Sequence, residues 1–258
     1  MQTRKIVAVV AILVSAWGSY QFLLGVLAGI RDARAASLTR EAVDLQAAGR
    51  FADSLPKTLE VVRLIPGSAI AHYNLGVTQM NLGDLAGAEA SYRGAIALDR
   101  SHADSWCNLG NVLLSDAGRL DEAAEATRTA IGLNPTDVQP RINLCAILIR
   151  ALDVDAAVDA GRNAVELAPE NAVAHQNLGV ALVQKKELVE AVRELERSVK
   201  LNPKASPAWY GLTVAYCTQE DAQGAWEAIR RARENGAAES IPENIVTAVQ
   251  EAIGAREE

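Results

Sequence analysis

The sequence predicts an all-α protein in which one apolar helix precedes a series of short helical hairpins. Half of the 258 residues are hydrophobic but only 4% are aromatic, so Ala, Leu, Val and Ile dominate, and this composition favours helices. A motif that contains Asn-Leu begins at Tyr73, Cys107, Ile142 and Gln176, which sets a period of 34 or 35 residues. A run of 25 uncharged residues, 6–30, stands before the first repeat.

The net charge and the cysteines exclude several classes of protein. The formal charge of −7 argues against nucleic acid as the main partner, because phosphate binding needs a cationic face. Cys107, Cys145 and Cys217 form neither a CxxC pair nor a disulfide framework. We therefore interpret the three cysteines as packing residues.

The N-terminal segment predicts a signal anchor, in which a short basic tail, residues 1–5, precedes a transmembrane helix, residues 6–30. At about 1.5 Å per residue this helix is ~37 Å long, enough to cross a hydrocarbon core of ~30 Å. A cleaved signal peptide is the alternative, because Ala33-Arg34-Ala35 has a small-x-small cleavage pattern. However, the apolar run exceeds the roughly 7–15 residues of a signal peptide, and Arg31 and Asp32 lie before that site.

The orientation of the predicted span depends on its basic flanks. If Arg4 and Lys5 stay inside, the repeats lie on the outer face, which in a bacterium is the periplasmic side of the inner membrane. The basic residues on the two sides of the span are similar in number, so the sequence leaves the orientation open. Removing residues 1–35 reduces the 25 basic and 32 acidic residues to 21 and 31, so the remaining body has a formal charge of −10.

From Ala35 onward the chain divides into six units, each of which is predicted to form two helices. In the second unit Gly83-Asp84 separates them, since glycine can end one helix and aspartate can cap the next. Small residues such as Gly110 and Ala157 recur where the helices of a unit must approach closely. The predicted units are 35–68, 69–102, 103–137, 138–171, 172–205 and 206–239, and a capping helix and tail, 240–258, follow them.

This pattern resembles the tetratricopeptide repeat (TPR) family over residues 35–236. The motifs that carry the resemblance are Asn-Leu-Gly, Gly-Asp-Leu, Asp-Glu-Ala at 121–123, and Leu-Asn-Pro at 133–135 and 201–203. The resemblance implies an α-solenoid of six TPR hairpins, in which residues 240–258 cover the apolar face of the last unit. The end units depart from the pattern, with Glu41 in place of leucine and Gly211 in place of asparagine.

The resemblance also implies a concave surface, lined by the first helices of the units, that binds extended peptides or partner helices. Four successive units carry asparagine at the sixth position, and such amides can donate to and accept from a peptide backbone. Asparagine is also common there as a structural residue, so both roles stay open. Tyr73 and Tyr210 are candidate anchors, because aromatic residues often dominate interfaces. The predicted binding residues are Tyr73, Asn74, Asn108, Asn111, Gln139, Asn143, Gln176, Asn177 and Tyr210.

The sequence contains no catalytic, cofactor or metal motif. His72, His102 and His175 fall in different units without HExxH spacing, and neither a phosphate-binding glycine loop nor GxSxG is present. We therefore expect a membrane-anchored protein–protein interaction scaffold, not an enzyme, that binds membrane or envelope proteins and assists assembly of a bacterial envelope complex. The alternatives are a soluble periplasmic or secreted adaptor released by cleavage, and a non-catalytic subunit of an enzyme.

Overall fold

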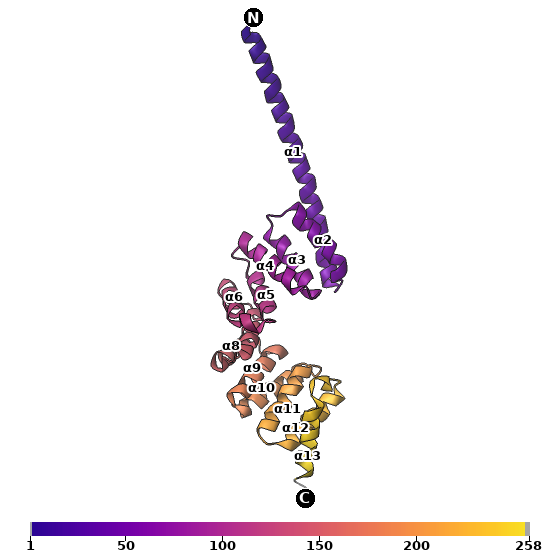
Figure 1. The fold of residues 1–258 in the computed structure, drawn as a ribbon, viewed down its shortest axis with the longest axis vertical. Coiled ribbons are helices and arrows are strands. Elements are labelled where there is room, and N and C mark those ends of the chain that lie inside the picture. The colour runs from indigo at the N-terminus through magenta and orange to yellow at the C-terminus, as the bar shows by residue number, and fades with distance from the viewer. Residues whose placement is uncertain (1, 256–258) are drawn as a thin grey trace. The chain divides into compact units, whose positions relative to one another are not determined.

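The computed structural model describes the backbone of residues 2–255, and it describes side chains from residue 21 onward except residue 22. This part of the chain contains thirteen α-helices and two short 3₁₀ turns, and it contains no strand (Figure 1). The helices divide into two compact units, residues 1–100 and 101–258. The all-helical class predicted from the composition is confirmed.

Unit 1 consists of four helices that pack in sequence order. They are α1 (Gln2–Ala47), α2 (Phe51–Leu64), α3 (Ala69–Asn81) and α4 (Leu85–Leu98). The hairpins are α1 with α2 and α3 with α4, and α2 packs against α3 between them. Figure 1 shows that α1 extends well beyond the other helices of this unit.

Unit 2 continues the same arrangement through nine helices, each of which packs against the helix that follows it. They are α5 (Ala103–Leu113), α6 (Leu120–Leu133), α7 (Gln139–Ala151), α8 (Val154–Leu167), α9 (Ala172–Lys185), α10 (Leu188–Leu201), α11 (Ser206–Thr218), α12 (Ala222–Glu234) and α13 (Glu243–Gly254). The 3₁₀ turns are η1 (Ala117–Arg119) before α6 and η2 (Ala238–Ser240) before α13.

The turn inside five of the six hairpins contains a left-handed residue, and in three of these turns an aspartate then caps the next helix, whereas the turn between α5 and α6 contains η1 instead. Gly83 has φ +82°, and the carboxylate of Asp84 then accepts a 2.9 Å hydrogen bond from the backbone N–H of Gly87, as the sequence predicts. In unit 2 the left-handed residues are Leu152, Lys186 and Glu220. The turn geometry is therefore retained where glycine is absent, at the cost of a conformation that side chains disfavour.

The close approach of the two helices in a hairpin is confirmed at the small residues. Gly110 of α5 lies so near α6 that a Cβ atom would come within 2.1 Å of the Thr127 Oγ1 and 3.0 Å of the Ala123 carbonyl oxygen. In the next hairpin the Cys145 thiol donates to the Ala157 carbonyl across 3.2 Å. Side chains larger than these would push the helices of a pair apart.

The predicted membrane span and the first repeat share one continuous helix, α1, although the sequence suggested two separate segments. Residues 31–47 contain neither glycine nor proline and include Ala33, Ala35 and Ala36, so nothing in them ends a helix. Among the residues whose side chains are described, no helix is long and apolar enough to cross a membrane. Most of the predicted span, residues 6–30, lies outside those described residues.

Candidate functional site: an apolar groove between α11 and α13

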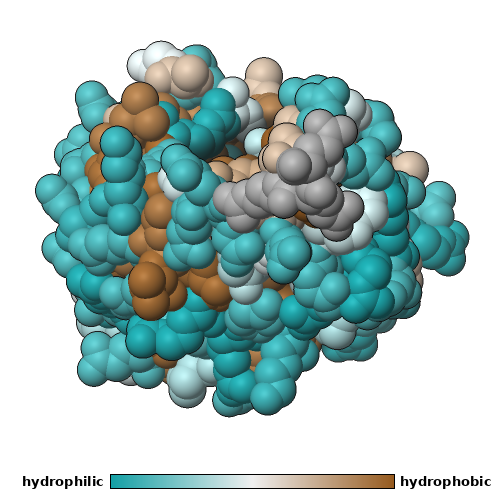
Figure 2. Space-filling model, turned by 90° about the horizontal axis from the view of Figure 1, so that it is seen from below, coloured by the Kyte–Doolittle hydropathy of each residue, from teal (hydrophilic) through white to brown (hydrophobic). Residues whose placement is uncertain are grey.

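An apolar groove with a volume of about 700 Å³ opens near the C-terminal end of unit 2. It lies between α11 and α13, and its size falls in the range of ligand-binding clefts. Its lining residues are Tyr210, Val214, Cys217, Thr218, Glu220, Ala222, Asn244, Ile245, Ala248, Val249 and Ala252. Figure 2 views the molecule from below Figure 1 and shows brown apolar side chains exposed among teal polar ones.

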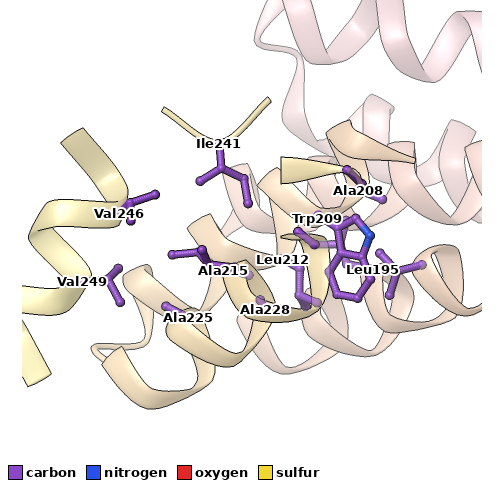
Figure 3. Close-up of a cluster of buried hydrophobic side chains, with 14 residues drawn as sticks. Leu195, Ala208, Trp209, Leu212, Ala215, Ala225, Ala228, Ile241, Val246 and Val249 are labelled. Carbon is purple, nitrogen blue, oxygen red and sulfur yellow. The ribbon is translucent and has the colours of Figure 1, made fainter. Parts of the chain in front are cut away.

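The first wall of the groove is one face of α11. Tyr210, Val214 and Cys217 are four and three residues apart, so they lie above one another on the helix. The opposite face of α11 is buried: Trp209, Leu212 and Ala215 enter the hydrophobic core of unit 2 (Figure 3). Burial of that face fixes the direction in which the groove-lining face points.

The second wall is α13, which the core holds in place. Ile241, Val246 and Val249 point from the chain before and within α13 toward the core, where they meet Ala215 and Ala225 (Figure 3). The Ser240 hydroxyl adds a 2.7 Å hydrogen bond to the carbonyl of Ser206 at the start of α11. The core therefore contains Ile241, Val246 and Val249, while Ile245 packs against the core and also lines the groove together with Val249 and Ala252.

The groove favours apolar groups over charged ones. Glu220 is the one charged side chain among its lining residues, while Val214, Ile245 and Ala248 form its walls. Cys217 is exposed, but partial desolvation by its neighbours raises the pKa of its thiol, so this side chain stays neutral near pH 7. Tyr210, which is 38% exposed, supplies an aromatic ring at the edge. This lining suits an apolar stretch of polypeptide.

Of the nine predicted binding residues, Tyr210 alone lies in this groove. Tyr73 and Asn74 belong to unit 1, and the other seven belong to unit 2. Tyr73 is half-buried and packs against the Tyr92 ring at a centroid distance of 6.1 Å, so it contributes to the hairpin of α3 and α4. Asn111 and Gln139 are exposed, and Gln176 is half-buried.

The asparagine ladder divides into two pairs with different surroundings. The Asn177 amide donates to the Ile142 carbonyl across 3.1 Å, and the Asn143 amide donates to the Cys107 sulfur across 3.4 Å. Both bonds link the first helices of neighbouring repeats. The side-chain amides of Asn74 and Asn108 form no hydrogen bond within the described part of the chain. The structural role therefore accounts for half of the ladder.

The sequence left the main groove residues unidentified for a physical reason. Val214 occupies a concave position of the sixth unit, but valine there is also a common packing residue. Ile245 and Val249 lie on one helical stripe with Ile241, a pattern that predicts a capping helix and not a groove wall. The register of α13 against α11, which exposes Ile245 and Ala248 to the groove, depends on tertiary packing and has no local signal.

The histidines have packing partners in the structure. His175 is buried, with its Nδ1 2.7 Å from Glu194 Oε2 and its Nε2 2.9 Å from the Pro169 carbonyl oxygen. His72 Nε2 lies 3.0 Å from the Pro66 carbonyl oxygen. Across the described residues, no three side chains of histidine, cysteine, aspartate or glutamate gather into a metal-binding cluster. Sequence reasoning missed Glu194, because its partner is 19 residues away and on another helix.

The fold defines a class of protein, a helical-hairpin repeat protein with an apolar groove near one end. Two sequence profiles, both described as tetratricopeptide repeat, match residues 39–102 and 78–138, and residues 151–216. Together these matches cover more than half of the chain, which therefore belongs to the tetratricopeptide repeat family. No curated protein sequence matches the chain significantly.

Several solved structures share this fold. PilW, a widely conserved type IV pilus biogenesis factor, superposes with a TM-score of 0.73 at 15% identity, over 83% of this chain and 98% of PilW. PilF from Pseudomonas aeruginosa gives 0.67 at 18% identity, over 79% and 92%. YrrB, a TPR protein with an unusual peptide-binding site, gives 0.57 at 21% identity, over 78% and 98%. Identities this low show the fold alone.

Proposed function

We propose that this protein is a membrane-anchored scaffold that binds a partner protein in the groove between α11 and α13. The groove itself is the main support for this proposal, because it exposes apolar walls that a lone chain leaves in contact with water. An apolar stretch of a partner, as a helix or an extended peptide, would cover Val214, Ile245 and Ala248 and release that water. The mechanism is binding without catalysis.

The similar structures support partners of the envelope class. One of them is named as a type IV pilus biogenesis factor and another as having a peptide-binding site. By analogy we propose that this chain assists assembly of an envelope complex. Confinement to a membrane surface would raise the effective concentration of membrane-bound partners around the groove.

The anchor is proposed from the sequence of α1. Its 25 uncharged residues at 6–30 form the longest apolar stretch in the chain. In the described part of that stretch, Leu23, Leu27 and Ile30 are each more than half exposed. Lipid tails would cover these side chains. We propose a single-pass protein of a bacterial inner membrane with the TPR domain in the periplasm.

Site-specific photo-crosslinking in native membranes tests the groove. A photoreactive phenylalanine analogue replaces Val214 or Ala248 in the full-length protein, and Val189, which is 84% exposed on α10, serves as the matched position outside the groove. We expect the two groove positions to capture the same protein through an apolar segment, identified by mass spectrometry of the cross-linked peptides. Equal capture from Val189, or none from the groove positions, would contradict the proposal.

The anchor has its own test. We expect full-length protein to stay in the membrane pellet after an alkaline carbonate wash. Its N-terminus should be Met1, or Gln2 if the initiator methionine has been removed. Release into the supernatant with an N-terminus near Ala35 would support the cleaved adaptor instead.

A further inference from the structure

A smaller cleft, with a volume of about 330 Å³, lies between the third and fourth hairpins, where α7 packs against α6 and α8. Each of these three helices contributes two lining residues that are three positions apart, so each pair lies on one face of its helix. The cleft shares no residue with the groove between α11 and α13. Its lining residues are Arg128 and Ile131 of α6, Arg141 and Leu144 of α7, and Ala160 and Asn163 of α8.

Two arginines and one amide supply the polar groups of this cleft, and none of its lining residues is acidic. The Arg141 Nη1 donates to the Asp137 backbone carbonyl across 3.0 Å, a bond that leaves the guanidinium without a counter-ion. Neither Arg141 nor Arg128 forms an ion pair with any residue that the structure describes. Two unneutralised cations therefore share one small cleft, although the body beyond residue 35 carries a formal charge of −10.

The repeat shows what the same positions contain elsewhere. We call the contact between one hairpin and the next a joint, and the polar lining positions of this joint recur 34 and 68 residues later, in the next two joints of unit 2. Arg128 corresponds to Arg162 and Glu196, Arg141 corresponds to His175 and Trp209, and Asn163 corresponds to Arg197 and Arg231.

In the joint between the fifth and sixth hairpins, these positions neutralise one another. Arg231 pairs with Glu196 at 3.0 Å, and its Cζ lies 5.0 Å from the centroid of the Trp209 ring. All three residues line one cleft, which is therefore the counterpart of the cleft beside α7. Here the protein itself supplies the carboxylate.

The joint between the fourth and fifth hairpins also contains its own carboxylates. Arg162 pairs with Glu190 at 3.1 Å, and Arg197 pairs with Glu170. Within these three joints of the described chain, every arginine at the equivalent positions has a carboxylate partner except Arg128 and Arg141. The joint between the third and fourth hairpins is therefore the one that lacks an anion.

We infer that the cleft between α6, α7 and α8 binds a glutamate side chain from an acidic segment of a partner protein. Arg128 and Arg141 hold the carboxylate through charge-assisted hydrogen bonds, and the Asn163 amide donates a further one. The methylene groups of the ligand lie on Ile131, which is half-buried. Carboxylates neutralise the arginines of the two equivalent joints, so this position favours a carboxylate over other anions. The inference goes beyond the proposed function, since it depends neither on the groove nor on the anchor.

Fluorescence anisotropy with a labelled hexaglutamate peptide and full-length protein in nonionic detergent tests this site. We expect Arg128→Gln or Arg141→Gln to weaken binding by about tenfold or more, because each removes a charge-assisted hydrogen bond. Arg162→Gln is the matched control, since Arg162 occupies the position of Arg128 in the next joint but already pairs with Glu190. This control should change the affinity by less than about twofold.

Arg128→Glu gives an independent readout. It places a carboxylate in the cleft beside Arg141, as Glu196 stands beside Arg231 in the last joint. We expect this variant to lose hexaglutamate binding and to melt at the same temperature as the original protein or higher. A lower melting temperature would mean that the cleft does not accommodate a carboxylate, and would overturn the inference.

The remaining outcomes are equally decisive. No binding of hexaglutamate would overturn the inference, as would equal weakening by Arg128→Gln and Arg162→Gln. A hexaglutamine peptide that binds as tightly as hexaglutamate would also overturn it, because charge would then play no part. Displacement of the peptide by inorganic phosphate at a concentration below that of the peptide, with ionic strength held constant, would make the cleft a site for a free anion and overturn the assignment to a protein partner.

Discussion

At the scale of single residues, the rings at the fourth position of the repeats have a common task. The Trp209 Nε1–H donates to the Pro203 carbonyl across 2.8 Å, and His72 and His175 approach the carbonyls of Pro66 and Pro169 in the same way. In each case the ring lies six residues after the proline. The bond satisfies a carbonyl in the turn between repeats, which explains why residues with ring N–H groups occupy this position.

Replacing Trp209 tests this role. Trp209→Phe removes the donor and part of a fully buried ring, so we expect unfolding free energy to fall by about 2–4 kcal/mol. Trp226→Phe is the matched control, because that ring is half-buried and contacts Arg233 instead of a carbonyl. Urea denaturation followed by circular dichroism measures both. Equal losses in the two variants would show that the Pro203 bond contributes nothing.

The three cysteines differ in burial, so their thiols should differ in reactivity. Burial raises the pKa of the Cys107 thiol to about 11 and that of Cys145 to about 12, and the thiolate is the form that alkylates. With a pKa near 12, about one Cys145 thiol in 10⁴ is ionised at pH 8. Cys217 is exposed, contrary to the packing role predicted for all three cysteines.

We therefore expect iodoacetamide at pH 8 to modify Cys217 first in the native protein. Cys107 and Cys145 should react only after unfolding in urea, and peptide mass spectrometry distinguishes the three sites. Because the folded thiols have raised pKa values, raising the pH toward 11 should increase labelling of Cys107 before that of Cys145 while the protein stays folded. Early labelling of Cys145 at pH 8 would contradict its burial.

At the scale of helices, the glycines of α5 and α6 offer a matched comparison. A Cβ on Gly110 would meet the Ala123 carbonyl at 3.0 Å, whereas a Cβ on Gly132 would meet nothing within 4 Å. We expect Gly110→Ala to destabilise the protein by about 1–3 kcal/mol through overpacking, and Gly132→Ala to stabilise it by about 0.5–1 kcal/mol. Thermal melts of both variants measure the shifts. A melting temperature that Gly110→Ala leaves unchanged would argue against the tight hairpin.

The helices and the turns between them differ in how well the sequence predicts them. The 34-residue period predicts the helix pairs because each hairpin is stabilised by contacts between near neighbours in the chain. The turns were predictable where Gly83-Asp84 provides the chemistry, but Leu152 and Lys186 adopt left-handed backbone without a sequence signal. There the packing of the flanking helices outweighs the local preference.

The candidate groove was predicted only at Tyr210. Aligning the repeats of this chain with one another shows that Tyr210 is an aromatic residue at a position expected to face the concave surface. The opposite wall, with Ile245 and Ala248, depends on how α13 settles against the last hairpin. That register is set by Val246 and Val249 entering a core formed by other helices, so it appears only when the whole of unit 2 is assembled.

At the scale of the whole molecule, each helix of a repeat protein is stabilised mainly by its neighbouring helices. The loss of one helix should therefore destabilise the helices next to it and leave distant ones unchanged. A chain ending after Ala237 lacks α13 and exposes the core that Ile241, Val246 and Val249 cover. Each of these side chains is worth roughly 1.5–3 kcal/mol when buried, so we expect a loss of about 5 kcal/mol or more in unit 2.

Hydrogen–deuterium exchange of the truncated chain locates that loss. Amides of α11 and α12 should exchange far faster than in the full chain, because they lose the cover that α13 provides. Amides of α2 and α3 in unit 1 should keep their rates, since their contacts are with one another and with α1 and α4. Uniformly faster exchange in both units would mean that the chain unfolds as one cooperative body. Unchanged exchange in α11 would mean that α13 neither caps the last hairpin nor holds one wall of the groove.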